Sequence, residues 1–164
     1  MGMAEEEKLF EQYGPYTGRT ILEVGSNHGS SHKHRKVAKD CVYFGLDQAA
    51  GDTVQIVHDL TRPLEVAPFD VVLCFSVLEH TPKPWLVAEN IGYLLKPGGL
   101  LLVSAPFQWR VHNYPDDYFR FTPSGFRSLF DYVNITEEGC WPPKTRLDSH
   151  VNGHVQIFLV GTKK

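Results

Sequence analysis

The stretch that decides the fold prediction is Thr20-Ile21-Leu22-Glu23-Val24-Gly25-Ser26-Asn27-His28-Gly29. Its first half, Thr20–Val24, is a short apolar run that predicts a β-strand ending at Gly25. In an open parallel sheet, ligands bind beyond the carboxyl ends of the strands, where glycine permits a positive φ and a close approach of the backbone. Asn27 stands where a further glycine is expected, and asparagine tolerates that conformation best among residues with a side chain. The stretch therefore predicts a ligand-binding turn, with a turn that only packs the strand as the alternative.

Further apolar runs predict a sheet of mainly parallel strands. They are Val42–Leu46, Val54–Val57, Phe69–Phe75, Gly99–Ser104, Asn134–Glu137 and Val155–Gly161. Most of them are almost wholly apolar, which is typical of strands that are covered on both faces. Helices are predicted over Trp85–Leu95 and from Thr122-Pro123 onward, together with a short, polar and largely exposed helix over Ser30–Lys39. This alternation predicts an α/β fold.

Two carboxylates at the ends of neighbouring predicted strands indicate an adenosine-containing ligand. Asp47 ends the second strand, where a carboxylate can accept both hydroxyls of a ribose. Asp59 follows the third strand, where it can read an adenine amino group. A nicotinamide dinucleotide is the alternative ligand, but Gly25-Ser26-Asn27-His28-Gly29 lacks the Gly-x-Gly-x-x-Gly spacing that admits a pyrophosphate.

Taken together, these motifs resemble the class I S-adenosylmethionine-dependent methyltransferases, and most closely the "type 11" small-molecule group. The matching residues are Glu23, Gly25, Asn27, Gly29, Asp47, Asp59-Leu60, Phe69–Val72, Leu78-Glu79-His80 and Leu95–Gly99. The resemblance runs from about Gly18 to Pro106, and Asn27 departs from it in replacing the middle glycine. It implies a Rossmann-like, doubly wound seven-stranded sheet of order 3-2-1-4-5-7-6 with the last strand antiparallel. Residues 1–164 would then form a single methyltransferase domain.

The resemblance also implies a set of residues for S-adenosylmethionine and its product S-adenosylhomocysteine. Glu23, Gly25 and Gly29 would cradle the methionine end, and Asp47 would bind the ribose. Asp59 and Leu60 would lie along the adenine. The full expected set is Glu23, Gly25, Ser26, Asn27, Gly29, Asp47, Gln48, Asp59, Leu60, Phe75 and Ser76.

The segment 107–121 is the predicted wall of an acceptor pocket. Six of its fifteen residues are aromatic, yet it is too polar and too broken by proline to be a core strand. The expected substrate-binding residues are Trp109, Tyr114, Tyr118 and Arg120. Its end resembles a stretch of bacterial methyltransferases from sugar and cell-surface glycan pathways, which favours a small or sugar-like acceptor. Packing of the aromatics on the sheet edge, with paired surface charges, is the alternative.

His80 is the first candidate for a general base, because the ordinary pKa of histidine, ~6.5, suits proton transfer near neutrality. His112 and Asp116 are further catalytic candidates, and capping of a helix is the alternative for His80. No metal is expected, because no cysteine or carboxylate completes a local ligand set around His28, His32 and His34. We expect those three histidines to lie on a solvated basic face.

Composition narrows the possible partners and the possible cellular compartment. The chain has 164 residues, a formal net charge of −3, and three cysteines in no CxxC pair. An acidic balance disfavours nucleic acid and anionic membranes as partners, and the cysteine usage together with an acidic start favours a cytoplasmic protein. Two alternatives stay open: an inactive cofactor-binding scaffold of the same fold, and a homo-oligomer or partner that completes the pocket.

Overall fold

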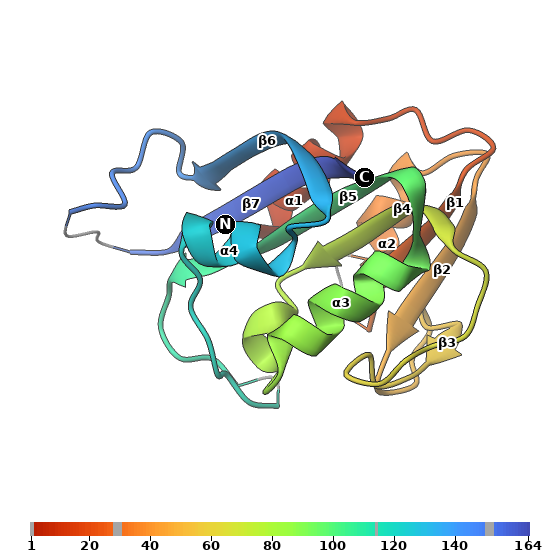
Figure 1. Cartoon of the computed structure of the whole chain (residues 1–164), viewed down its shortest axis with the longest axis horizontal. Coiled ribbons are helices and arrows are strands. Elements are labelled where there is room, and N and C mark those ends of the chain that lie inside the picture. The colour runs from red at the N-terminus through yellow and green to blue at the C-terminus, as the bar shows by residue number, and fades with distance from the viewer. Residues whose placement is uncertain (1, 28–30, 114, 150–152) are drawn as a thin grey trace.

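The computed structural model describes residues 2–27, 31–113, 115–149 and 153–164 (Figure 1). Over these residues the chain forms a seven-stranded sheet of order β3-β2-β1-β4-β5-β7-β6. The strands are β1 (Thr20–Val24), β2 (Val42–Asp47), β3 (Ile56–Val57), β4 (Phe69–Phe75), β5 (Leu95–Gln108), β6 (Val133–Trp141) and β7 (Val155–Lys163). β1 to β5 pair in parallel, and β7 pairs antiparallel with both β5 and β6. The predicted strand order and the antiparallel last strand are confirmed.

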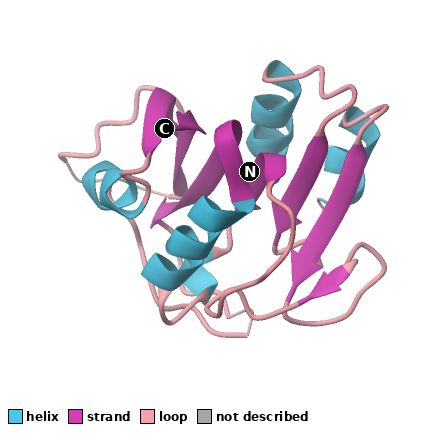
Figure 2. Cartoon of the chain, turned by 45° about the vertical axis from the view of Figure 1, so that its right-hand side comes forward, coloured by secondary structure: helices cyan, strands magenta, loops and turns pink. Residues whose placement is uncertain are grey.

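Helices cover both faces of the sheet (Figure 2). They are α1 (Gly2–Gln12), α2 (Ser31–Val37), α3 (Pro84–Leu94), α4 (Pro123–Leu129) and the 3-10 helix η1 (Leu78–His80). The strands alternate between two cores: Val72 and Cys74 of β4 face the core of α3 and α4, while Val71 and Leu73 face the core of α1. Since successive strand residues point to opposite faces, a strand between two cores is apolar at every position.

Local sequence signals account for most element boundaries. Thr122 caps α4, accepting a hydrogen bond from the backbone N–H of Gly125 at 3.1 Å, and Pro123 occupies the first turn as predicted. β3 is shorter than the predicted Val54–Val57, because Val54 closes a turn back to the carbonyl of Gly51. β5 extends beyond the predicted Gly99–Ser104, because it continues to pair with β7.

Two helices differ from the sequence expectations. α1 was not predicted, because its acidic start reads as a solvated segment, yet Leu9 and Phe10 on one side of it are buried against the sheet. α2 is not simply a solvated basic face: His32 is exposed, but His34 is 1% exposed. The tertiary fold thus places an N-terminal helix and one histidine of α2 next to the carboxyl edge of the sheet.

No helix in the described part of the chain has both the length and the apolar character that crossing a membrane requires.

Candidate active site

One cavity of about 1060 Å³ lies at the carboxyl ends of the parallel strands. Residues that follow β1, β2 and β3 line one end of it, among them Gly25, Asp47 and Asp59. His80, after β4, and Trp109, after β5, line the other. A topological switch point, where neighbouring strands send their connections to opposite faces, is where such a fold binds ligands.

The turn after β1 is shaped by Gly25. Its φ is +75°, and an added Cβ would lie 2.4 Å from a methyl carbon of Val77, so a side chain does not fit there. The backbone N–H groups of Gly25 and Ser26 both donate to the carbonyl of Leu46, at 2.8 and 3.1 Å. This pins the turn against the end of β2 and leaves bare backbone facing the cavity.

Asn27 does not adopt the positive φ that the sequence suggested. Instead it ties the turn to the loop after β2: its backbone N–H donates to Oδ2 of Asp47 at 3.1 Å, and its amide donates to the carbonyl of Ala50 at 3.4 Å. Gly51 leaves room for that amide, because a Cβ there would lie 2.0 Å from Oδ1 of Asn27. Asparagine at this position therefore braces two loops around the cavity.

The two predicted strand-tip carboxylates reach the cavity as expected. Asp47 is partly buried, and its Oδ1 accepts the backbone N–H of Ala49 at 3.0 Å. Asp59 is exposed, and hydrogen bonds from the hydroxyl and backbone N–H of Thr61 lower the pKa of its carboxyl. The lowered pKa keeps the Asp59 carboxyl ionised near neutrality.

Other predicted donor-site residues divide into two groups. Residues on the cavity wall are Glu23, Asn27, Gln48, Leu60, Phe75 and Ser76. Ser26 is fully buried and donates to the carbonyl of Thr53 at 3.3 Å, so its side chain is absent from the cavity lining. Gly29 lies outside the described residues.

Glu23 is tied to its neighbours rather than free to meet a ligand with both oxygens. Oε1 lies 2.7 Å from Nδ1 of His34, and Oε2 accepts the hydroxyl of Tyr43 at 2.9 Å. The expectation that His34 lies on a solvated face is wrong, since this contact is buried beneath the turn. A buried carboxylate needs such partners.

Glu6 of α1 is a cavity residue that sequence reasoning missed. It is 2% exposed, and its Oε1 accepts hydrogen bonds from Ser76 at 3.0 Å, from Ser104, and from Gln156 at 3.3 Å. Burial raises the pKa of its carboxyl. Its place three and four residues before Leu9 and Phe10, on the same helix face, was the available signal.

Ser76 holds a strained backbone at the floor of the cavity. Its φ is +54°, in the left-handed region that residues with side chains avoid. Its hydroxyl meets Glu6, and the amide of Gln156 donates to it at 2.7 Å. Strain of this kind clusters at functional sites.

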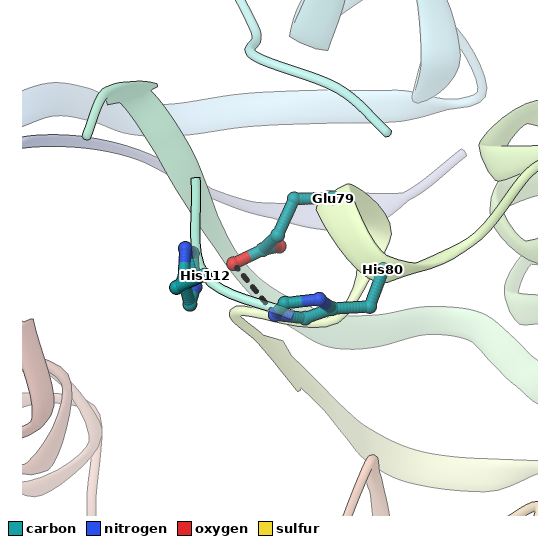
Figure 3. Close-up of side chains that lie close together, drawn as sticks. All are labelled: Glu79, His80 and His112. Carbon is teal, nitrogen blue, oxygen red and sulfur yellow. Dashed lines mark ion pairs between the residues drawn. The ribbon is translucent and has the colours of Figure 1, made fainter. Parts of the chain in front are cut away.

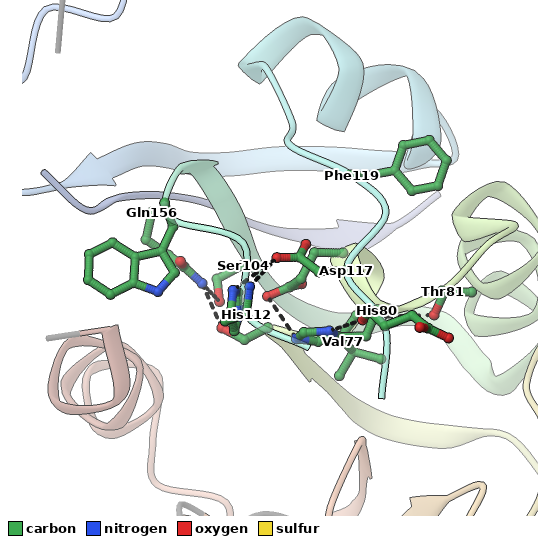
Figure 4. A network of polar contacts seen from close by, with 12 residues as sticks. Val77, His80, Thr81, Ser104, His112, Asp117, Phe119 and Gln156 are labelled. Carbon is green, nitrogen blue, oxygen red and sulfur yellow. Dashed lines mark hydrogen bonds and ion pairs between the residues drawn. The ribbon is translucent and has the colours of Figure 1, made fainter. Parts of the chain in front are cut away.

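At the acceptor end, a polar network surrounds His80 and His112 (Figure 4). Nδ1 of His80 lies 2.6 Å from the backbone carbonyl of Asp116, and Nδ1 of His112 lies 3.1 Å from Oδ2 of Asp117. Arg120 donates to both oxygens of Asp117, and these bonds hold the pKa of that carboxyl well below its usual range. The loop between β5 and α4 is thus fixed by charge-assisted hydrogen bonds.

Glu79 is buried beside the two histidines (Figure 3). Burial raises the pKa of its carboxyl to about 8. Its Oε1 lies 3.9 Å from Nε2 of His80, and its Oε2 has no hydrogen-bond partner among the described residues. Neither Glu79 nor Asp117 was predicted as a site residue, although each is adjacent to one that was.

The predicted acceptor residues are only partly brought together. His80, His112 and Trp109 line the cavity, whereas Asp116, Tyr118 and Arg120 are absent from its lining. Tyr118 donates its hydroxyl to Asp116 at 3.0 Å, and Arg120 donates to the carbonyl of Trp109 at 3.2 Å. These three side chains therefore contact other residues of the loop instead of the cavity. Tyr114 lies outside the described residues.

Residues 6–148 match a family model described as a methyltransferase domain. This match is consistent with the fold and with the position of the cavity. The chain belongs to the S-adenosylmethionine-dependent methyltransferase family. It is 33% identical over 150 residues to the ubiquinone biosynthesis O-methyltransferase of Xylella fastidiosa strain 9a5c, covering 77% of this chain and 60% of the relative. Across the first curated relatives, the chain spans 37% to 60% of their length.

Solved structures show the same fold at low identity. A Burkholderia thailandensis 1,6-didemethyltoxoflavin-N1-methyltransferase, solved with bound 1,6-didemethyltoxoflavin and S-adenosylhomocysteine, has a TM-score of 0.74 at 15% identity, covering 99% of this chain and 78% of that one. A complex of the Haloferax volcanii Trm112 methyltransferase activator and a putative methyltransferase gives a TM-score of 0.68 at 17% identity, covering 99% and 92%. The cavity described above is therefore the candidate active site of this methyltransferase.

Proposed function

We propose that this methyltransferase moves a methyl group from S-adenosylmethionine to a hydroxyl or amine of a small acceptor within the described cavity. One observation carries the proposal: a single cavity joins the strand-tip residues Gly25, Asp47 and Asp59 to His80 and Trp109. The small-molecule methyltransferases among the relatives and neighbours support the same class of acceptor.

The donor end suits this ligand chemically. When bound, S-adenosylmethionine supplies an electrophilic methyl carbon on a positively charged sulfur. The carboxylates of Glu23, Asp47 and Asp59 line the cavity and favour a cation there. Asp47 binds the ribose hydroxyls, Asp59 and Leu60 lie along the adenine, and bare backbone at Gly25 receives the methionine end. Gln48 and Phe75 complete the wall, and Ser76 the floor.

The acceptor end positions the nucleophile. With Nδ1 of His80 donating to the Asp116 carbonyl, its Nε2 keeps a lone pair that accepts a hydrogen bond from the acceptor's O–H or N–H. His112 and Trp109 exclude water on the other side. Alignment of the nucleophile with the methyl–sulfur bond, in a dry site, is the contribution that a protein makes to a direct displacement.

Acceptors of this class bind beside Trp109, which packs against His154 of the cavity lining with ring centroids 4.3 Å apart. A flat or sugar-like ring stacks on such a surface. A partner or a second copy of the chain completes this side. The H. volcanii relative, solved with an activator protein, supports that part of the proposal.

The experiment is calorimetry with S-adenosylhomocysteine on the purified chain, followed by turnover with a panel of hydroxyl and amine acceptors. Asp47→Asn removes one charge at the predicted ribose contact and is expected to weaken binding about tenfold or more, the loss of one charge-assisted hydrogen bond. Asp52→Asn is the matched control, because Asp52 is exposed nearby and absent from the cavity lining.

Unchanged binding in Asp47→Asn contradicts the donor site. Donor binding without turnover across the whole panel favours the inactive scaffold instead.

A further inference from the structure

Three metal-ligating side chains converge at the acceptor end of the cavity (Figure 3). They are Glu79 and His80 of η1 and His112 of the loop after β5, and one ligand atom of each lies within 4.8 Å of the other two. His80 and His112 also line the cavity. The sequence expectation of no metal considered only the histidines near α2, because His112 is far from Glu79 along the chain.

Both histidines are held in the tautomer that a metal needs. Nδ1 of His80 lies 2.6 Å from the carbonyl of Asp116, and a carbonyl only accepts, so Nδ1 carries the proton. Nδ1 of His112 faces the carbonyl of Arg110 at 3.2 Å and the carboxylate of Asp117 at 3.1 Å. In each ring Nε2 therefore keeps its lone pair. Metal-ligating histidines donate their other ring N–H to a carbonyl or carboxylate in this way.

Glu79 supplies an independent observation. Its side chain is 1% exposed, and Oε2 has no hydrogen-bond partner among the described residues. A buried polar atom without a partner is costly, and native structures contain few of them. The Glu79 carboxyl and one ring nitrogen of each histidine thus share one small space, and Oε1 of that carboxyl lies 3.9 Å from Nε2 of His80. A cation satisfies all three.

We propose that Glu79, His80 and His112 bind one divalent transition-metal ion, of which Zn²⁺ and Mn²⁺ are representative. Two imidazoles and one carboxylate suit these ions better than Mg²⁺ or Ca²⁺, which prefer oxygen ligands throughout. At bond lengths of about 2.1 Å, ligand atoms on one ion stand about 3.0–3.5 Å apart. The ligand atoms, which lie within 4.8 Å of one another, therefore close by up to about 1.3–1.8 Å when the ion binds, through side-chain rotations of Glu79 and of the histidines.

Three protein ligands leave open positions, and these face the cavity because both histidines line it. This role rests on the proposed function: the ion binds the acceptor oxygen, so the acceptor is a hydroxyl or phenol. A metal-bound hydroxyl loses its proton to water more readily. The O–CH₃ bond then forms as the S–CH₃ bond breaks with its electron pair on sulfur. In the metal-bound protein Nε2 of His80 therefore binds the ion and contacts the acceptor through it, whereas the direct hydrogen bond of the proposed function belongs to the metal-free protein.

Asp117 is a positioning residue for this site. Its side chain is 1% exposed, accepts two hydrogen bonds from Arg120 at 2.5 and 2.8 Å, and faces Nδ1 of His112. Removing such a partner of a metal-ligating histidine typically lowers metal affinity about 10- to 100-fold. Asp117→Asn is expected to do so while the three ligands remain.

The test uses the purified full chain, freed of metal with a chelator and titrated with Zn²⁺ by calorimetry and with Co²⁺ by visible absorption. One ion per chain is expected, with a Co²⁺ spectrum of a histidine-containing site. Glu79→Gln and His112→Asn are each expected to abolish stoichiometric binding. His154→Asn is the matched control, because His154 is a cavity histidine outside the cluster and its removal leaves metal binding unchanged. Thermal unfolding confirms that each variant folds.

Stoichiometric binding that is lost in both ligand variants and kept in His154→Asn supports the site. No stoichiometric binding to the wild-type chain overturns it, and so does binding that survives both ligand substitutions. The S-adenosylhomocysteine calorimetry above is run without metal. A failed metal titration with intact donor binding therefore contradicts this inference alone.

Discussion

Nδ1 of His34 lies 2.7 Å from Oε1 of Glu23, with both side chains buried, so that α2 is fastened to the end of β1 directly beneath the candidate donor site. His34 also packs edge-on against Phe10 of α1 and Phe75 of β4. These contacts join α2 to three other elements, β1, α1 and β4. His34, although it lies in a basic helix, therefore helps to hold Glu23 and the neighbouring elements in place at the candidate donor site.

Replacing His34 by alanine is expected to lower the free energy of unfolding by about 3 kcal/mol, because it leaves the buried Glu23 carboxylate without one partner. Urea denaturation measures this loss. His32→Ala is the control on the same helix, and a change of less than about 0.5 kcal/mol is expected there since His32 is exposed. Equal losses in both variants would show that the buried contact contributes little.

Gly25→Ala is expected to destabilise the protein more than Gly18→Ala. Both glycines have a positive φ, +75° and +74°, but an added Cβ meets Val77 at 2.4 Å in the first and nothing within 4 Å in the second. Gly18→Ala therefore measures the backbone strain alone, about 1 kcal/mol. Gly25→Ala adds a steric clash at the cavity and is expected also to weaken donor binding. Thermal unfolding and calorimetry of both variants test this, and equal effects contradict it.

Glu6 is expected to give the protein a pH-dependent stability that Glu6→Gln lacks. Burial raises the pKa of this carboxyl in the folded state above its unfolded value, so the folded state holds its proton more tightly. The unfolding free energy of the wild type therefore falls relative to the variant as the pH rises above about 4.5. Unfolding between pH 4 and 8 measures the difference.

Glu11→Gln on the same helix is the control, because Glu11 is exposed. A Glu6→Gln profile parallel to that of the wild type contradicts the prediction.

Asp70 is expected to lose a stabilising contribution in acid. A hydrogen bond from Lys96 at 2.7 Å, with further bonds from Thr20, lowers the pKa of its carboxyl from 3.8 to about 2. The depressed pKa means that the contribution is complete above about pH 4 and is lost as the pH falls toward 2. In Lys96→Met the loss is expected at higher pH, as NMR titration of the Asp70 carboxyl measures. Lys39→Met serves as the exposed control, and an unchanged titration in Lys96→Met would refute the assignment.

Local sequence patterns were sufficient to predict the central strands of the sheet. β1, β4 and β5 lie between two cores, so their residues are apolar at nearly every position, and this pattern is visible in the sequence of each strand alone. Asp47 and Asp59 were predictable for the same reason, since a residue that ends a parallel strand lies at the ligand edge whatever else the chain does.

The acceptor end was less predictable. Trp109 and His80 follow strand ends and line the cavity as expected, but Arg120 turns away to bind Asp117. Asp117 is only three residues before Arg120, and such pairing was the alternative offered for this segment, but the sequence did not decide between the ion pair and a place on the cavity wall.

The sequence by itself predicted the apolar strands, the turn at Gly25 and the carboxylates at the strand tips, because these follow from periodicity and position within single elements. The strand order was implied by the resemblance of its motifs to the class I methyltransferases. Only the tertiary structure placed Glu6 on the cavity floor, buried His34 against Glu23, and brought Glu79 and His80 to His112. Each of those contacts joins residues on different elements. Packing of helices on the sheet and folding of the loop after β5 toward η1 created them, and neither contact follows from spacing along the chain.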